Sequence, residues 1–93
     1  MSSITSFVKV AELGASECDL LVKLIERVKA AEEKHPDFAD GIYQGVGVLG
    51  EEYGELCQAL NKGEGEERVM DEAFDLLCVA WRFCRMDWKK KGE

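Results

Sequence analysis

The tetrapeptide KGEG at residues 62–65 constrains the fold most strongly, because it holds two glycines and no apolar residue between two long segments of helical pattern. We expect the segment before it to be helical from about Asp40 to about Asn61. The segment after it should be helical from about Glu66 to about Lys90. A short turn between two helices places them side by side and antiparallel. The sequence therefore predicts a helical hairpin.

The rest of the chain also has helical spacing. A short helix is expected over residues 3–13, followed by an amphipathic helix that Ser16 caps and that runs to about Lys34, before Pro36 ends it. The apolar positions of this second helix are Leu20, Leu21, Leu24, Ile25 and Val28. No segment alternates apolar and polar residues as a strand does. We predict an all-α bundle in which residues 1–93 form one domain, with a modest core that association would enlarge.

The net charge of the chain limits its possible binding partners, and its cysteine content indicates its cellular compartment. A formal net charge of −7 argues against binding to nucleic acid or anionic membranes, which proteins bind through basic surfaces. The four cysteines form no C-x-x-C pair and stand among apolar neighbours, which indicates buried free thiols and a reducing compartment. The N-terminal residues lack a signal-peptide pattern, and no segment has the roughly 18 consecutive apolar residues of a membrane span. We therefore expect a cytoplasmic protein.

Gly45, Gly47 and Gly50 match the G-x-G-x-x-G pattern of a dinucleotide-binding turn, but their context excludes that function. The preceding residues, HPDFADGIYQ, contain a proline and several charged groups, and do not form the buried strand that such a turn requires. The glutamates that follow would also repel a pyrophosphate group. Gly47, Gly50 and Gly54 instead recur at helical spacing, which predicts a face on which another helix packs closely.

Five carboxylates flank the predicted turn in two groups: Glu51, Glu52 and Glu55 before it, and Glu72 and Asp75 after it. Within each group the spacing of three or four residues places side chains on a shared helical face. Residues equally distant from the middle of the turn face each other in a hairpin, so Glu55 opposes Glu72 and Glu52 opposes Asp75. This spacing places the four carboxylates at the same height along the hairpin. It does not determine how each helix is rotated about its own axis.

Carboxylates that converge at one level need a positive partner. Asp75 lies inside the apolar run AFDLLCVAWRF. A structural arginine partner is possible, but the nearest arginine on its face, Arg82, is two turns away. Oxygen ligands suit Mg²⁺ or Mn²⁺, whereas a di-iron bundle would need Glu-x-x-His pairs. The single histidine, His35, lies in a predicted loop. Because Mg²⁺ in proteins usually acts on phosphates, we expect a phosphorylated substrate.

The two acidic motifs, in the contexts VLGEEYGELCQAL and DEAFDLLCVAWRF, resemble those of the MazG-like, all-α nucleoside triphosphate pyrophosphohydrolases. The resemblance covers about residues 48–83. It implies a helical fold whose four-helix core is completed by dimerisation, as a homodimer or a tetramer of two dimers. It also implies Mg²⁺-dependent cleavage of the α–β phosphate bond of an NTP or dNTP, which gives the monophosphate and pyrophosphate.

The resemblance assigns roles to the carboxylates one by one. Glu52, Glu55, Glu72 and Asp75 would bind the metal. Glu51 would be a further ligand or the catalytic base that orients the attacking water.

No motif sets the residues that would contact the nucleotide. Candidates for the outer phosphates are Lys62, Arg68, Arg82 and Arg85, and candidates for the base are His35, Phe38, Tyr43, Asn61, Trp81 and Trp88. From these we expect His35, Phe38, Lys62 and Arg82 to bind substrate. Arg82 is equally suited to an ion pair, and Trp81 fits a core or a dimer interface better than a base.

Two other functions stay open at this point. A catalytically silent helical module that binds a metal, a nucleotide or a protein would keep the same carboxylates. A simple acidic bundle that acts as an adaptor would leave them solvated. Mg²⁺ should stabilise a carboxylate cage and have no effect on a solvated acidic face.

Overall fold

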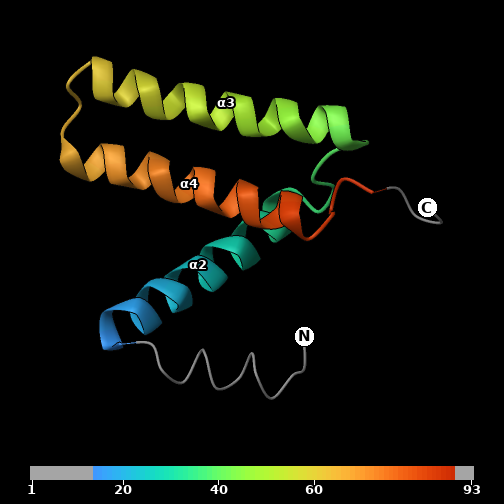
Figure 1. Ribbon diagram of the computed structural model, residues 1–93, viewed down its shortest axis with the longest axis horizontal. Coiled ribbons are helices and arrows are strands. Elements are labelled where there is room, and N and C mark those ends of the chain that lie inside the picture. Colours follow the sequence, from blue (N-terminus) through green and yellow to red (C-terminus); the bar gives the residue numbers. More distant parts are fainter. Residues whose placement is uncertain (1–13, 90–93) are drawn as a thin grey trace.

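The computed structural model describes residues 14–89, and the regular secondary structure of this part of the chain is all helix, without a strand. Its helices are α2 (Ala15–Lys34), α3 (Ile42–Asn61) and α4 (Glu66–Cys84). Figure 1 shows α3 and α4 side by side and antiparallel, joined by the turn at residues 62–65. The predicted helical hairpin and all-α class are confirmed.

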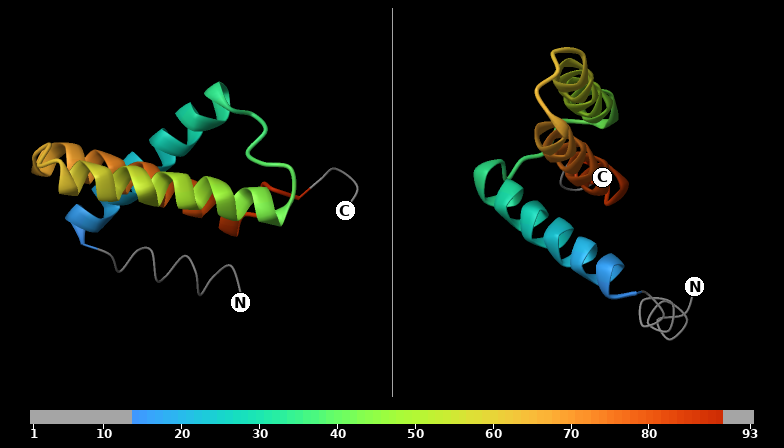
Figure 2. Two further views of the ribbon diagram at one scale, coloured as in Figure 1. Left: turned by 90° about the horizontal axis from the view of Figure 1, so that it is seen from above. Right: turned by 90° about the vertical axis from the view of Figure 1, so that its left-hand side faces the viewer.

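Helix α4 is the central element of the described chain, since it contacts both α3 and α2, while α2 and α3 do not contact each other. Figure 2 shows α2 crossing α4 obliquely, away from α3. Because α2 covers α4 from one side only, an open region remains between α2 and α3. A cavity lined by residues of all three helices and of the α2–α3 loop lies in this region.

The core is small and lies between α2 and α4. Leu24 and Val28 of α2 pack with Cys78 of α4, and all three are buried. Because only two helices cover α4, its apolar surface is not buried all round, and Leu77 and Trp81 are each 41% exposed. The described chain alone therefore does not bury α4 completely.

The ends of the helices differ from the prediction at three points. Gly14 is the N-cap residue of α2, and Ser16 lies within the first turn of that helix. Helix α3 begins at Ile42, two residues after the predicted start. Helix α4 ends at Cys84 rather than near Lys90, because the chain turns at Met86, which has a φ of 65°. The predicted short helix over residues 3–13 lies outside the described residues.

The glycines of α3 do not pack as predicted. A Cβ atom at Gly47, Gly50 or Gly54 would meet nothing within 4 Å, so these residues make no close helix contact in the described chain. The close contact is at Gly45, where a Cβ atom would lie 3.1 Å from the Phe83 ring. The predicted close packing at Gly47, Gly50 and Gly54 is therefore absent within the described chain.

The remaining predictions concern the cysteines and the membrane. None of the four cysteines forms a disulfide, as expected, but only Cys78 is buried, whereas Cys18 and Cys57 are half-buried and Cys84 is exposed. Within residues 14–89 no helix has the length and apolar character needed to cross a membrane.

Candidate metal centre

Three carboxylates from two helices meet on the hairpin. Glu52 and Glu55 extend from α3 and Glu72 extends from α4, and one oxygen of each lies within 4.8 Å of the other two. The spacing of three residues places Glu52 and Glu55 on one side of α3, and the antiparallel arrangement brings Glu72 to their level. The structure therefore brings together three of the four predicted metal ligands.

Two of these carboxylates have a buried oxygen without a hydrogen-bond partner among the described residues, Oε2 of Glu52 and Oε2 of Glu72. Glu72 is only 3% exposed, and its other oxygen, Oε1, forms an ion pair with Arg68 one turn earlier. A buried carboxylate oxygen without a partner is costly, and a cation among the three side chains would satisfy both atoms. The donors are all carboxylate oxygens, which hard divalent cations prefer.

The same crowding changes the ionisation of Glu52. Burial, together with the negative charges of Glu55, Asp75 and Glu72, raises the pKa of Glu52 from 4.5 to about 7. Without a cation, Glu52 is therefore protonated in about half of the molecules at neutral pH. A metal ion that binds there displaces this proton, which makes its affinity depend on pH.

Asp75 has a partner that the sequence reasoning missed. Arg27 of α2 donates from Nη1 to Asp75 Oδ1 at 3.2 Å and from Nη2 to Asp71 Oδ1 at 2.8 Å. Burial raises the pKa of Asp75, and the Arg27 charge partly offsets this rise. The sequence left an arginine partner for Asp75 possible and pointed only to Arg82 of the same helix, whereas the partner is Arg27 of α2.

A signal for Arg27 was present in the sequence. It lies three residues after Leu24 and four before Ala31, both on the apolar side of α2 that packs against α4. A charged residue at the edge of such a row is well placed to pair across the helix interface. Its guanidinium also lies 5.2 Å from the centre of the Phe74 ring, in a cation–π contact.

A cavity of about 630 Å³ adjoins the carboxylates, in the open region beside α2. Glu51, Glu52 and Asp75 line one part of it, and His35 and Phe38 of the α2–α3 loop line another. Its other lining residues include the cations Arg27, Lys34 and Arg82 and the apolar residues Ala30, Ala31, Val48 and Val79. Apolar lining with a few convergent charged groups is typical of small-molecule sites of this volume.

The two predicted phosphate contacts occupy different surroundings. Lys62 is the exposed C-cap residue of α3 at the hairpin turn, and it is not among the residues that line the cavity. Arg82 lines the cavity, but its guanidinium bonds to His35 O, to Pro36 O and to the Asp87 carboxylate. Of the aromatic candidates for base stacking, Phe38 lines the cavity, whereas Tyr43 is 92% exposed.

Comparison with protein-family models, with curated proteins and with solved structures found no match for this chain.

Proposed function

We propose that the chain is a MazG-like, Mg²⁺-dependent nucleoside triphosphate pyrophosphohydrolase. It would cleave the α–β phosphate bond of an NTP or dNTP and release the monophosphate and pyrophosphate. The observation that carries the proposal is the cluster of Glu52, Glu55 and Glu72 within 4.8 Å, in which two buried oxygens lack a partner. Removal of non-standard or surplus nucleotides in the cytoplasm suits such an activity and the four free thiols.

The residues present fit a divalent cation. Glu52 and Glu72 offer buried oxygens, Glu55 offers an exposed carboxylate, and Asp75 lies close enough for its charge to raise the pKa of Glu52. Neither histidine nor cysteine takes part in this cluster, which favours Mg²⁺ or Mn²⁺ over zinc. When bound, such an ion neutralises phosphate charge and lowers the pKa of coordinated water.

The protein's own groups would then bind and orient the substrate. Glu51 is exposed at the cavity, where its carboxylate can accept a proton from the attacking water. The volume of about 630 Å³ falls within the range for small-molecule sites. His35 and Phe38 line the part of the cavity formed by the α2–α3 loop, where they suit the base. Lys34 and Arg27 place positive charge on the same cavity.

We further propose that the active form is a dimer with a four-helix core. Helix α3 exposes Tyr43, Val46, Tyr53 and Leu60, which recur with Gly50 and Cys57 at alternating intervals of three and four residues. This row lies on the side of α3 opposite the cavity-lining Val48, Glu51 and Glu52. Such spacing forms the seam of packed helix pairs, and a glycine in it lets a second helix approach closely.

Light scattering tests the dimer with Tyr53→Glu, which places a charge in the middle of this row. The variant should be monomeric at concentrations where the wild type is dimeric. Gln58→Glu adds the same charge to an exposed position of α3 outside the row and should leave the dimer intact. A wild-type monomer, or an unaffected Tyr53→Glu dimer, would contradict the proposal.

The hydrolase is tested by incubating the chain with a panel of NTPs and dNTPs, with Mg²⁺ or with EDTA, and identifying the products. Monophosphate and pyrophosphate in equal amounts are expected, whereas diphosphate and inorganic phosphate would indicate a different reaction. Glu55→Gln should abolish the release, and because Glu55 is exposed this variant should fold normally. Glu26→Gln, at an exposed position of α2, is the matched control.

One observation favours the catalytically silent module as a second candidate. Arg68 pairs with Glu72 and Arg27 pairs with Asp75, so arginines neutralise part of the carboxylate charge without a metal. In that case folded wild-type protein would release no pyrophosphate from any nucleotide. The exposed apolar row on α3 would then be a surface for another protein.

A further inference from the structure

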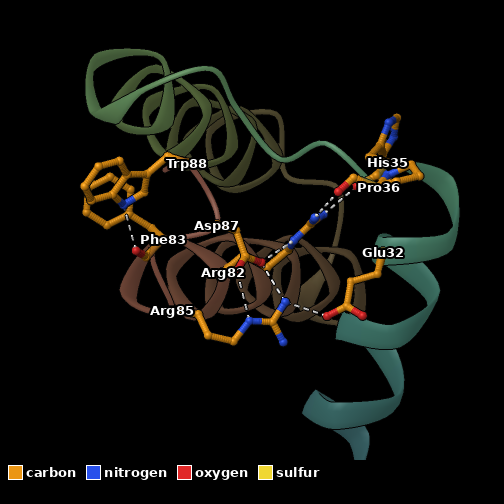
Figure 3. A network of polar contacts seen from close by, with 8 residues as sticks. All are labelled: Glu32, His35, Pro36, Arg82, Phe83, Arg85, Asp87 and Trp88. Atoms are coloured by element: carbon orange, nitrogen blue, oxygen red, sulfur yellow. Dashed lines mark hydrogen bonds and ion pairs between the residues drawn. The ribbon is translucent and has the colours of Figure 1, made fainter. Parts of the chain in front are cut away.

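Arg82 is a buried arginine whose guanidinium bonds to the start of the α2–α3 loop and to Asp87. The residue is 4% exposed. Its Nη1 donates to His35 O at 2.9 Å and its Nη2 to Pro36 O at 3.3 Å, as Figure 3 shows. Its Nε donates to Asp87 Oδ2 at 3.2 Å. All three nitrogens of the guanidinium therefore serve contacts within the chain, and two of them hold the start of the α2–α3 loop.

The other end of this loop is attached to the same part of α4. The Gly41 N–H donates to Trp88 O at 2.9 Å. Trp88 is itself fixed, because its indole N–H donates to Phe83 O at 3.0 Å and its ring lies 6.0 Å from the Phe83 ring, centre to centre. Residues 82–88 thus hold the loop at residues 35–36 and again at residue 41. We call residues 82–88 the clamp.

A further ion pair joins the clamp to α2. Arg85 Nη2 lies 2.6 Å from Glu32 Oε1 and 2.6 Å from Asp87 Oδ2. The Asp87 carboxylate therefore accepts hydrogen bonds from both Arg82 and Arg85, and the hydrogen bond from Arg85 holds the pKa of Asp87 below its usual value. Asp87 stays ionised at neutral pH, which keeps its bonds to both arginines strong.

The loop held in this way carries the two candidates for base recognition. His35 and Phe38 both line the cavity. The Arg82 guanidinium lies 5.2 Å from the centre of the Phe38 ring, in a cation–π contact that limits where the ring can lie. Side chains of an unattached loop of seven residues would sample many positions. Ordering them on binding would reduce the affinity for a substrate.

We propose that Arg82 is a positioning residue: with Asp87 it clamps residues 35–41 so that His35 and Phe38 are held ready for the nucleotide base. This assigns Arg82 no contact with phosphate. The clamp itself rests only on the contacts above, whereas its effect on substrate rests on the proposed hydrolase. Lysine cannot replace Arg82, because one ammonium on a flexible stem cannot reach three partners in the directions set by a planar guanidinium.

Amide hydrogen exchange tests the clamp without any substrate. In Arg82→Met and Arg82→Lys, exchange at Gly41 and over the loop should rise by about tenfold or more, since loss of one or two charge-assisted hydrogen bonds is worth that factor. Exchange in the middle of α3 should not change. Asp87→Asn, which keeps the shape of the clamp and removes one charge, should give a smaller rise at the same amides. Lys29→Met removes a positive charge from an exposed position of α2 and is the control.

Unchanged loop exchange in folded Arg82 variants would overturn the clamp. If Arg82→Met does not fold, loop exchange in Asp87→Asn decides the question on the same criterion.

Kinetics then test the effect of the clamp on substrate binding. Both Arg82 variants should raise KM for the nucleotide by about tenfold, by the same estimate, while kcat and the Mg²⁺ dependence change little. Recovery of KM in Arg82→Lys would instead make Arg82 a phosphate contact and overturn its assignment as a positioning residue. A wild type that hydrolyses nothing while the loop exchange responds would refute the hydrolase, and with it the effect on substrate, but not the clamp.

Discussion

Replacing Glu52 with glutamine tests the electrostatics of the carboxylate cluster directly. Burial and three neighbouring carboxylates raise the pKa of Glu52 from 4.5 to about 7 in the folded protein. A carboxyl group with a raised pKa binds more protons in the folded state than in the unfolded state between these two values. The metal-free protein must therefore lose stability as the pH rises from about 4.5 to about 7. Glutamine has nearly the same shape, carries no charge and does not titrate, so it removes this loss.

The magnitude follows from the size of the shift. Each unit of pKa difference corresponds to about 1.4 kcal/mol, so a shift from 4.5 to about 7 costs at most about 3.5 kcal/mol at pH 8. Solvent screening reduces this figure because Glu52 is partly exposed, and we expect Glu52→Gln to stabilise the metal-free protein by about 1–3 kcal/mol at pH 8. At pH 5 Glu52 of the wild type is largely protonated in the folded state, and the gain from glutamine should fall below about 1 kcal/mol.

The assay is urea unfolding at pH 5 and pH 8, with EDTA and then with Mg²⁺. In EDTA the variant should be the more stable protein at pH 8. Mg²⁺ should raise the stability of the wild type and have much less effect on the variant, since a ligand stabilises only the state that binds it. Glu26→Gln should show neither effect. A Glu52→Gln protein that is less stable than the wild type at pH 8 in EDTA, or a gain that is equal at both pH values, would refute the reasoning.

Three further changes probe the packing and the charge of the hairpin. Gly45→Ala should destabilise the protein by about 1 kcal/mol in urea unfolding, because the new Cβ would lie 3.1 Å from the Phe83 ring and this outweighs the better helix propensity of alanine. Gly47→Ala, where a Cβ atom meets nothing within 4 Å, should instead stabilise the monomer by up to about 1 kcal/mol, and equal effects at the two positions would contradict the assigned packing. Arg68→Met removes the partner of buried Glu72 and should cost about 1–2 kcal/mol in EDTA. Mg²⁺ should recover most of that loss, and a loss that Mg²⁺ leaves unchanged would mean that no cation reaches Glu72.

The hairpin and the meeting of its carboxylates could be predicted because both depend on local spacing. A turn of fixed length sets which residues of α3 and α4 face each other, and intervals of three or four residues place Glu52 and Glu55 on one side of α3. Counting residues from the middle of the turn correctly placed Glu72 opposite Glu55. It could not determine the rotation of α4 about its axis, which turns Asp75 toward α2 and Arg27.

The remaining features depend on contacts between distant segments. The crossing of α2 over α4 pairs Arg27 with Asp75, and no spacing within one helix contains that information. Helix α4 was predicted to continue to Lys90, because nothing local marks its end. The chain instead turns at Met86 and bonds through Trp88 to Gly41, a tertiary contact that outweighs local helix propensity. For the same reason Arg82 could be placed on a face of α4 but not assigned its partners in the loop.

Electron paramagnetic resonance of Mn²⁺, titrated into the wild type and into Glu55→Gln, tests the metal centre most directly. Free Mn²⁺ gives a strong solution signal that is lost on binding, so the titration yields both affinity and stoichiometry. Saturable binding by the wild type that Mg²⁺ displaces, and that Glu55→Gln weakens severely, is the predicted result. A wild type that leaves the Mn²⁺ signal unchanged, or that binds as well after the loss of Glu55, would contradict a metal centre at Glu52, Glu55 and Glu72.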